Sequence, residues 1–393
     1  MSLPLGYSYS AVYAGIRKTN KKDLALIYSQ VPASAAAVFT SNLVKAAPVL
    51  HAQASLRASR GRVRAILINA GNANCATRTG AAVARATTSA LAKQLRIPAN
   101  QVFPSSTGVI GVELNPALIT NALPQLVADA SPDKFDHVAL AIMTTDIVPK
   151  SLSLGLELKS GEVRLAGMTK GSGMIHPNMA TTLGFVMTDA AISPAQLQPI
   201  LKRAINLSYN RISVDGDQST NDTVVVLANG ASGVTLKTRK DLDSFEQSLT
   251  YLLQDLAKQI ARDGEGARKL VTIRVEGART EPQAAQIGRS IANSPLVKTA
   301  IAGADPNWGR LICAAGYAGV PFDPRQVDIY FQDVPVCKRG LAVDFNESAL
   351  IEKLKEPDVS VRFVIRGAHK ASATFWTCDF TEGYIQINGS YRT

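Results

Sequence analysis

The sequence predicts a compact α/β protein with at least two lobes. Its 393 residues are too many for one simple hydrophobic core. Hydrophobic residues make up 46% and charged residues 19% of the chain, a balance typical of globular and not of disordered proteins. Short apolar runs alternate with longer stretches of helical spacing, so both strands and helices are expected.

Several classes of protein fit this sequence poorly. No apolar stretch reaches the roughly 20 residues that cross a bilayer, and the N-terminus, MSLPLGYSYS, lacks a basic segment followed by an apolar one. A cytoplasmic location without membrane contact is therefore expected. The net charge is +11, but the basic residues are not interleaved with aromatics, so nucleic-acid binding is not expected. The four cysteines form no CxxC pair, which favours reduced thiols over disulfides or a metal site.

The first half of the chain combines strands with three helices. A basic start and an apolar end are typical of a strand at 62–69. Pro98 ends one helix, and Ser131 caps another. Strict alternation predicts a half-buried strand at 151–158 that pairs with 161–168 through a tight turn. The expected strands are 23–28, 35–40, 62–69, 151–158 and 161–168, and the expected helices are 80–95, 115–127 and 131–143.

Helix signals dominate the second half. Ser193 caps one helix and Pro194 takes its first position, and Gly264 ends the longest helical pattern. The expected helices are 193–207, 240–263, 281–293, one that starts within 305–310, and 347–355; the expected strands are 183–187, 269–276, 296–302 and short pieces after 326. A gentle change of composition at 278–281 divides a catalytic core, residues 1–280, from a C-terminal lobe, residues 281–393.

The most informative stretch runs from Lys170 to Ala190, KGSGMIHPNMATTLGFVMTDA. A glycine-rich turn and a polar elbow at His176 lead into an apolar strand, which starts at Thr181 and Thr182. Functional groups are often held at such a junction of loop and rigid element. We expect the chain to be cut between Ala180 and Thr181, which makes Thr181 an N-terminal nucleophile.

An N-terminal threonine carries its own base. The hydroxyl of Thr181 is a poor nucleophile without an adjacent base. The freed α-amine has a reference pKa of about 7.7–8.0, near the working pH where a general base is most efficient. The cut itself is expected as a self-reaction, in which Thr181 Oγ attacks the Ala180 carbonyl and the resulting ester hydrolyses. His176 is an alternative base, although a lone histidine at a turn is more often structural.

Other candidate sites are weaker. The chain has no HExxH, GxSxG, GxxxxGK[ST] or GxGxxG motif. Small hydroxyl residues before a glycine, at 104–111, could aim N–H groups at a ligand or form an ordinary turn. The acidic run 214–223 fails as an EF-hand because Val226 stands at the twelfth loop position, so a structural or site-lining turn is expected. Glu265, between two glycines, is either an exposed turn acid or a ligand contact.

Ordered motifs along essentially the whole chain resemble one family, the glutamate N-acetyltransferases of the ornithine acetyltransferase type, from arginine biosynthesis. No single motif would suffice, but the set is highly specific. The motifs are DLAL at 23–26, AAVFT at 36–40, NAGNAN at 69–74, residues 104–111, TTD at 144–146, residues 170–181 and 213–223, DGEGA at 263–267, residues 305–310 and 387–393.

The resemblance implies a layered α/β/β/α-type self-processing acyltransferase fold with a smaller α+β C-terminal lobe. It implies self-cleavage into chains 1–180 and 181–393, which assemble as a heterotetramer of two alpha and two beta chains. The implied reaction moves acetyl from N2-acetyl-L-ornithine to L-glutamate through an acetyl-threonine, without a cofactor. Some family members also use acetyl-CoA as donor and some do not, and both alternatives stay open here.

The resemblance also implies the roles of individual residues. Thr181 is the nucleophile and acetyl carrier, and Thr107 and Gly108 form the oxyanion hole. Lys170 suits a substrate α-carboxylate, and Glu265 suits the ornithine side-chain ammonium. The implied substrate contacts are Thr144, Lys170, Thr181, Glu265, Asn388 and Thr393.

The chain departs from the family pattern near the nucleophile. Thr182 stands where methionine is usual, Gly184 follows where alanine is common, and the loop 75–80 is unusual. Two other functions compete with acetyl transfer. A self-processing aminopeptidase or amidase would release the acyl group to water, whereas a non-enzymatic basic binding protein would keep its chain intact.

Overall fold

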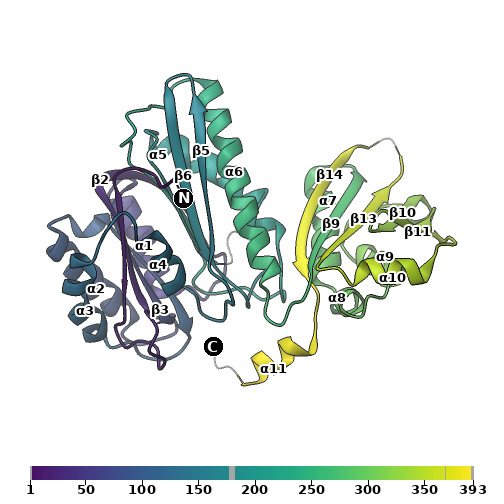
Figure 1. Ribbon diagram of the computed structural model, residues 1–393, viewed down its shortest axis with the longest axis horizontal. Helices are drawn as coiled ribbons and strands as arrows, with labels where there is room; N and C mark the ends of the chain where they lie inside the picture. The colour runs from purple at the N-terminus through teal and green to yellow at the C-terminus, as the bar shows by residue number, and fades with distance from the viewer. Residues whose placement is uncertain (1, 177–181, 368, 391–393) are drawn as a thin grey trace.

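The chain forms two lobes, each built around one β-sheet, as the computed structural model shows in Figure 1. The structure describes residues 2–176, 182–367 and 369–390. The α/β class and the smaller C-terminal lobe are both confirmed. Among the helices of the described residues, none is long and apolar enough to cross a membrane.

The larger lobe contains an eight-stranded mixed sheet. Its order is β4-β3-β2-β8-β7-β6-β5, and β1 pairs with β2 outside this path. The pairs β3–β4 and β7–β8 are parallel, and the other pairs are antiparallel. The strands are β1 (Tyr7–Val12), β2 (Leu24–Phe39), β3 (Arg62–Asn72), β4 (Val102–Val109), β5 (Lys150–Leu158), β6 (Gly161–Lys170), β7 (Leu183–Thr188) and β8 (Thr223–Ala228).

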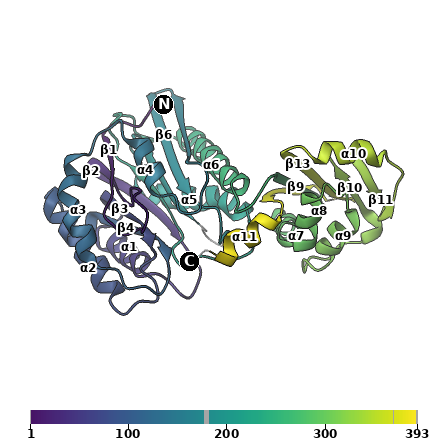
Figure 2. The same ribbon diagram turned by 60° about the horizontal axis from the view of Figure 1, so that its bottom comes forward.

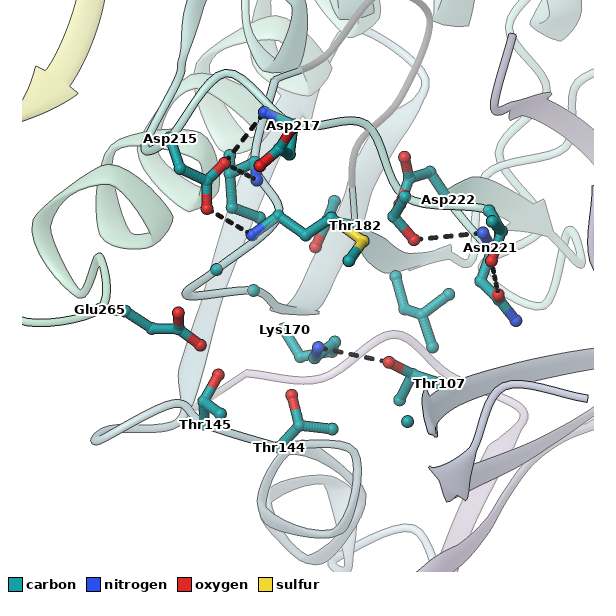
Figure 3. A pocket seen from close by; sticks show the side chains of 18 of the residues that line it. Thr107, Thr144, Thr145, Lys170, Thr182, Asp215, Asp217, Asn221, Asp222 and Glu265 are labelled. Carbon is teal, nitrogen blue, oxygen red and sulfur yellow. Dashed lines mark hydrogen bonds between the residues drawn. The ribbon is translucent and has the colours of Figure 1, made fainter. Parts of the chain in front are cut away.

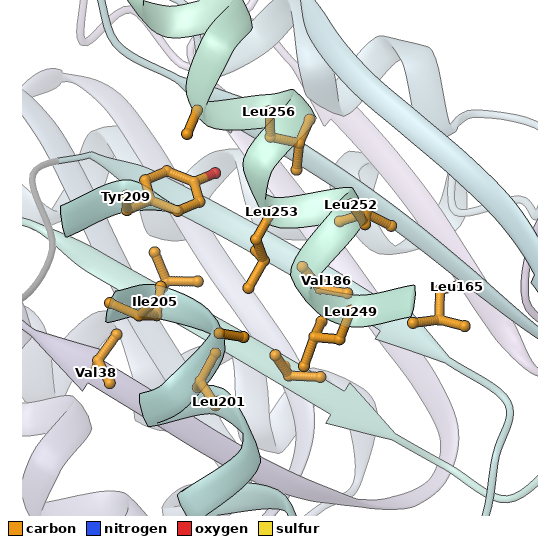
Figure 4. Close-up of a cluster of buried hydrophobic side chains, with 14 of the residues drawn as sticks. Val38, Leu165, Val186, Leu201, Ile205, Tyr209, Leu249, Leu252, Leu253 and Leu256 are labelled. Carbon is orange, nitrogen blue, oxygen red and sulfur yellow. The ribbon is translucent and has the colours of Figure 1, made fainter. Parts of the chain in front are cut away.

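Helices cover both faces of this sheet. The α-helices of the larger lobe are α1 (Ala47–Ala58), α2 (Gly80–Leu95), α3 (Pro116–Ala128), α4 (Phe135–Ala141), α5 (Pro194–Asn206) and α6 (Arg239–Arg262). Figure 4 shows apolar side chains of α5 and α6 meeting Val186 of β7 and Leu165 of β6. Phe185 and Met187, which flank Val186 in the sequence, belong to the core on the opposite face of the sheet, together with residues of α4. Strand β7 is therefore buried on both faces, which explains its continuous apolar sequence.

The smaller lobe has a six-stranded sheet in the order β12-β11-β10-β13-β9-β14 and a hydrophobic core of its own. Its strands are β9 (Leu270–Ala278), β10 (Val327–Phe331), β11 (Val334–Lys338), β12 (Leu341–Ala342), β13 (Asp358–Ile365) and β14 (Ala371–Cys378). Its α-helices are α7 (Glu281–Asn293), α8 (Pro295–Ala302), α9 (Trp308–Gly316) and α10 (Glu347–Leu354), and the chain also has short 3₁₀ turns at Ala99–Gln101, Tyr209–Arg211 and Pro324–Gln326.

The boundary between the lobes lies earlier than residue 280. Strand β9 pairs with β13 in parallel and with β14 antiparallel, so it is a central strand of the second sheet. The expected catalytic core, residues 1–280, therefore wrongly includes β9, which belongs to the smaller lobe. A last helix, α11 (Glu382–Ser390), leaves the second lobe and lies between the two lobes, as Figure 2 shows.

Four predicted elements are wrong in detail. The pieces 23–28 and 35–40 form one strand, β2, with a register shift between Tyr28 and Ala33. Ser131 caps no helix, since its backbone pairs with Tyr9 and α4 begins only at Phe135. The predicted strand 296–302 is the helix α8.

Local signals for α8 were present in the sequence. The side chain of Ser294 accepts a hydrogen bond from Val297 N, and Pro295 takes the first helical position. Both features are typical of a helix start. The apolar residues of this short segment nevertheless resemble a buried strand, because periodicity alone does not separate the two in short runs.

Candidate active site

A polar cavity of about 260 Å³ lies where β4 and β6 end, where β7 begins and where α11 returns from the second lobe (Figure 3). Most of the described candidate residues line it. It contains, among others, Thr107, Gly108, Thr144, Lys170, Thr182, Asp215, Asp217, Asp222, Glu265, Tyr384 and Asn388. Residues Ala180, Thr181 and Thr393, which the sequence assigns to cleavage, nucleophile and substrate contact, lie outside the described residues.

Thr107 and Gly108 lie within β4, directly before its last residue Val109, and do not form a separate turn. Gly108 has φ +128°, and a Cβ there would lie 2.3 Å from the carbonyl carbon of Gly71 on the parallel neighbour β3. Only glycine fits this position, because the backbone approach leaves no room for a side chain. Beside it, Lys170 Nζ donates a hydrogen bond of 3.3 Å to Thr107 Oγ1.

Lys170 is the only lysine or arginine that lines the cavity within the described part of the chain. Burial lowers the pKa of its ammonium, while Asp146, Asp222 and Glu265 act in the opposite direction. Four carboxyl groups line the same cavity, namely Asp215, Asp217, Asp222 and Glu265. A ligand with a carboxylate and one or two ammonium groups therefore complements the cavity electrostatically.

Glu265 is a cavity residue and not an exposed turn acid. It is 6% exposed, and its backbone N–H donates to the carbonyl of Ser172 at 3.0 Å. Its carboxylate packs on Gly173, where a Cβ would lie 2.3 Å from Oε2. Asn388 Nδ2 donates to the same oxygen at 2.8 Å. The glycine turn and α11 together fix the direction of this carboxylate.

A buried ionic group holds two segments that line the cavity. Lys150 is fully buried, and its ammonium contacts the carboxylates of Asp146, at 2.7 Å, and Asp263. Asp146 also accepts the backbone N–H groups of Gly171, at 2.7 Å, and Thr144, at 2.9 Å. Burial opposes the charge of Asp146, but Lys170 and Lys150 lower its pKa to about 2. The group therefore fixes the turn after Lys170 and the loop that carries Thr144.

The acidic run 214–223 lines the cavity, which agrees with the site-lining alternative for this turn. The carboxylate of Asp215 accepts N–H groups of Met174 at 2.6 Å, Ile175 at 2.8 Å and Asp217 at 3.1 Å. Asp222 is only 3% exposed, and burial raises its pKa well above the ordinary value. The backbone N–H of Thr182 donates to the Asp222 carboxyl group, so this acid directly holds the residue that follows Thr181.

The surroundings of Thr182 and His176 bear on the choice of nucleophile and base. Thr182 is 5% exposed, and its Oγ1 lies 3.2 Å from Thr169 Oγ1, so its hydroxyl belongs to a buried pair. His176 Nδ1 accepts a hydrogen bond of 3.2 Å from Asn293 Nδ2. His176 lines a different cavity, which favours a structural role over that of the alternative base.

Sequence reasoning missed several residues that build the site. Tyr384 lines the cavity from α11, a helix that was not predicted. Asp146 and Asp263 belong to motifs of the family but had no predicted role, and Lys150 was not predicted. Their partners are up to 113 residues apart in the chain, so no local pattern could identify the group that they form.

The fold and the cavity define a two-lobed α/β enzyme with a polar site for a small charged substrate. The family model of ArgJ matches residues 8–393. The chain belongs to the ArgJ family.

Similar proteins cover the whole chain. It is 48% identical over 392 residues to the "Arginine biosynthesis bifunctional protein ArgJ" of Desulfotalea psychrophila, with 99% of both chains covered. It is 44% identical over 391 residues to the protein of the same name from Chlorobaculum tepidum, with 99% of this chain and 96% of that one covered. A crystal structure of ArgJ from Bacillus halodurans matches with 42% identity and a TM-score of 0.51, and it covers 53% of this chain and 98% of that one.

Proposed function

We infer that this chain is an acetyltransferase of arginine biosynthesis, which moves acetyl from N2-acetyl-L-ornithine to L-glutamate and yields L-ornithine and N-acetyl-L-glutamate. Membership of the ArgJ family supports the reaction. The observation in the structure that carries the substrate class is the pairing of one cation, Lys170, with an oriented carboxylate, Glu265, in one small cavity. Both substrates are amino acids, and N-acetylornithine brings a carboxylate and a side-chain ammonium.

We assign the chemistry to Thr181, with Thr107 and Gly108 as the oxyanion hole. Thr181 Oγ attacks the acetyl carbonyl while its own α-amine takes the proton. The tetrahedral intermediate collapses to acetyl-threonine, and ornithine leaves with that proton on its amine. The α-amine of glutamate then attacks the ester and regenerates Thr181. Loss of one oxyanion donor typically raises such a barrier by about 2.7–4 kcal/mol.

The substrate contacts follow from charge. Lys170 binds the α-carboxylate, and Glu265 binds the side-chain ammonium of ornithine. Asn388 orients Glu265 through its 2.8 Å hydrogen bond. Thr144 and Thr393 complete the proposed set; Thr144 lines the cavity, and Thr393 lies outside the described residues.

We further propose that the chain cuts itself before Thr181 and that two such pairs form a heterotetramer. A length agreement supports the cut: the expected second chain, residues 181–393, is about 54% of the sequence. The solved chain from Bacillus halodurans matches over 98% of its own length and covers 53% of this one.

Product analysis tests the proposed reaction. The purified protein is incubated with N-acetylornithine, with and without glutamate, and acetate and N-acetylglutamate are measured. We expect N-acetylglutamate to form together with ornithine, and little acetate. Acetate release that glutamate does not change would support the hydrolase alternative and contradict acetyl transfer.

A second activity is proposed from the word "bifunctional" in the names of the relatives. In this reaction acetyl-CoA acetylates Thr181, and the acetyl group passes to glutamate as before. Formation of N-acetylglutamate from acetyl-CoA and glutamate, without N-acetylornithine, is the measurement. Release of coenzyme A together with acetate, without N-acetylglutamate, would contradict this second activity.

A further inference from the structure

A second cavity, of about 410 Å³, lies between the elbow of the larger lobe and the smaller lobe. The elbow contributes His176. Helix α7 contributes Arg289, Ser290 and Asn293, and the segment after α9 contributes Tyr317. No carboxylate lines this cavity within the described residues, and it shares no lining residue with the substrate cavity.

Arg289 is the charged residue of this cavity, and its charge is not neutralised. Its Nε is buried and has no hydrogen-bond partner among the described residues. It forms no ion pair in that part of the chain either. Burial lowers the pKa of its guanidinium, and the charge of Arg211 lowers it further. Arg211 is itself paired with Glu281, so the remaining positive charge is that of Arg289.

His176 presents a second donor. Ser213 Oγ donates to Asn293 Oδ1 at 2.5 Å, and Asn293 Nδ2 in turn lies 3.2 Å from His176 Nδ1. An amide nitrogen only donates, so Nδ1 accepts and the neutral imidazole carries its proton on Nε2. Burial and the charge of Arg289 lower the pKa of His176 more than the hydrogen bond with Asn293 and the charge of Asp217 raise it, which favours this neutral form. Among the described residues, Nε2–H has no hydrogen-bond partner.

We propose that this cavity is a binding site for a phosphate-type oxyanion, held by the guanidinium of Arg289 and by Nε2–H of His176. A guanidinium offers a planar fork of donors that matches the oxygens of phosphate. Arg289 is half-buried and only its Nε is fully enclosed, so an anion with several acceptors would satisfy this donor and offset the repulsion from Arg211. The volume exceeds that of one phosphate ion, so the ligand is either free phosphate or a phosphate on a larger molecule.

The position of the site gives it a consequence for the enzyme. His176 directly follows Ile175, which lines the substrate cavity, and it precedes Thr181 by five residues in the sequence. An anion bound to His176 and Arg289 would join the elbow to α7 and thus the larger lobe to the smaller one. The proposal does not depend on acetyl transfer, because no residue of the catalytic cavity takes part.

Isothermal titration calorimetry with inorganic phosphate, at constant ionic strength, tests the site on the full-length wild-type protein. We expect saturable binding of one phosphate per chain and at least tenfold weaker binding by Arg289→Gln. Arg289→Lys keeps the charge but loses the fork, so we expect intermediate affinity. The matched control is Arg325→Gln, an exposed arginine of the same lobe that pairs with Asp323, with unchanged affinity.

Thermal melting of Arg289→Gln serves as the test of folding, and its midpoint is expected to match that of the wild-type protein. No phosphate binding by the wild-type protein would overturn the site. So would equal phosphate affinity of the folded Arg289→Gln variant, or equal binding of chloride.

A second set of titrations separates the two sources of phosphate. Coenzyme A and 3′-dephospho-coenzyme A are compared with inorganic phosphate. A nucleotide ligand is identified if coenzyme A binds more tightly than inorganic phosphate. This gain must disappear with 3′-dephospho-coenzyme A and in Arg289→Gln. Equal affinity for inorganic phosphate and coenzyme A identifies free phosphate as sufficient. Coenzyme A binding that does not change in Arg289→Gln would contradict a role of this cavity in nucleotide binding.

Discussion

At the scale of single residues, the neighbours of Glu265 fix the direction of its carboxylate in the cavity. Glu265 is enclosed by Gly173 on one side and by Asn388 on the other, so its side chain has little freedom. A fixed carboxylate binds an ammonium without a large loss of side-chain entropy. Because the side chain is held in place, a substitution that removes the charge of Glu265 but keeps its shape tests its electrostatic role alone.

We predict that Glu265→Gln raises the KM for N-acetylornithine at least tenfold, which corresponds to about 1.4 kcal/mol. Glutamine keeps the shape but loses the charge that pairs with the ammonium. Steady-state kinetics against N-acetylornithine is the measurement. Glu276→Gln, in the partly exposed ion pair of β9 with Arg274, is the control and should behave as wild type. An unchanged KM for Glu265→Gln would show that the ammonium binds elsewhere.

A backbone position gives the second prediction. Gly108→Ala places a Cβ 2.3 Å from the Gly71 carbonyl carbon, at a φ of +128° that side chains rarely adopt. The N–H groups of this segment must shift, and we expect turnover to fall by about 10²-fold or more. Gly316→Ala is the control, since a Cβ there meets nothing within 4 Å. Turnover and thermal melting are measured for both; wild-type turnover in Gly108→Ala would rule out the proposed oxyanion hole.

At the scale of elements, the helix α6 leads into the turn 263–266 that carries Glu265. It packs its apolar side on the sheet, and its end leads directly into Asp263 and Glu265. Its start is fixed by a capping box, in which the Thr238 side chain accepts from Asp241 N and the Asp241 side chain accepts from Thr238 N. One continuous helix therefore connects this capped start with the residues of the site.

We predict that Thr238→Ala lowers the free energy of unfolding by about 1 kcal/mol, because the N–H of Asp241 loses its cap. Urea denaturation measures the change. Thr19→Ala, at an exposed loop position, is the matched control and should change stability by less than half as much. Equal loss in both variants would mean that the capping box contributes nothing specific.

The elements differ in how well the sequence predicts them. Ser193 with Pro194, and Gly264 after a long amphipathic pattern, are strong local signals, and α5 and α6 are confirmed. α11 has no comparable apolar periodicity. It is held by distant contacts, such as Asn388 to Glu265 across 123 residues. Local propensity carries no information on such a contact, so α11 was not predicted.

The site shows the same limit. The resemblance to a family located Thr107, Lys170 and Glu265, and the structure brings these three into one cavity. Lys150 was not predicted, because a lysine within an alternating strand is ordinarily exposed. Its burial depends on two carboxylates that come from other parts of the chain.

At the scale of the whole molecule, acidity tests the ionic support under the site. The pKa of Asp146 is lowered from 3.8 to about 2. A lowered carboxyl pKa stabilises the fold above the unfolded value, and this contribution is lost as the pH falls from about 4 towards 2.

We therefore predict that the free energy of unfolding decreases between pH 4 and pH 2, and that Asp146→Asn has a smaller slope in this window. Urea unfolding at several pH values is the measurement. Asp136→Asn, on the short helix α4, is the control and should keep the wild-type slope. Identical slopes for wild type and Asp146→Asn would contradict the low pKa of Asp146.

The proposed self-cleavage breaks one bond of the whole chain, between Ala180 and Thr181. Intact mass and N-terminal sequencing of the purified protein test it most directly. We predict two chains, residues 1–180 and 181–393, with Thr181 at the new terminus, whereas Thr181→Ala stays a single, inactive chain. Thr182→Ala, which changes the buried neighbour, should still be cut at the same bond. An uncut wild-type protein, a new terminus at Thr182, or full turnover in Thr181→Ala would contradict the account.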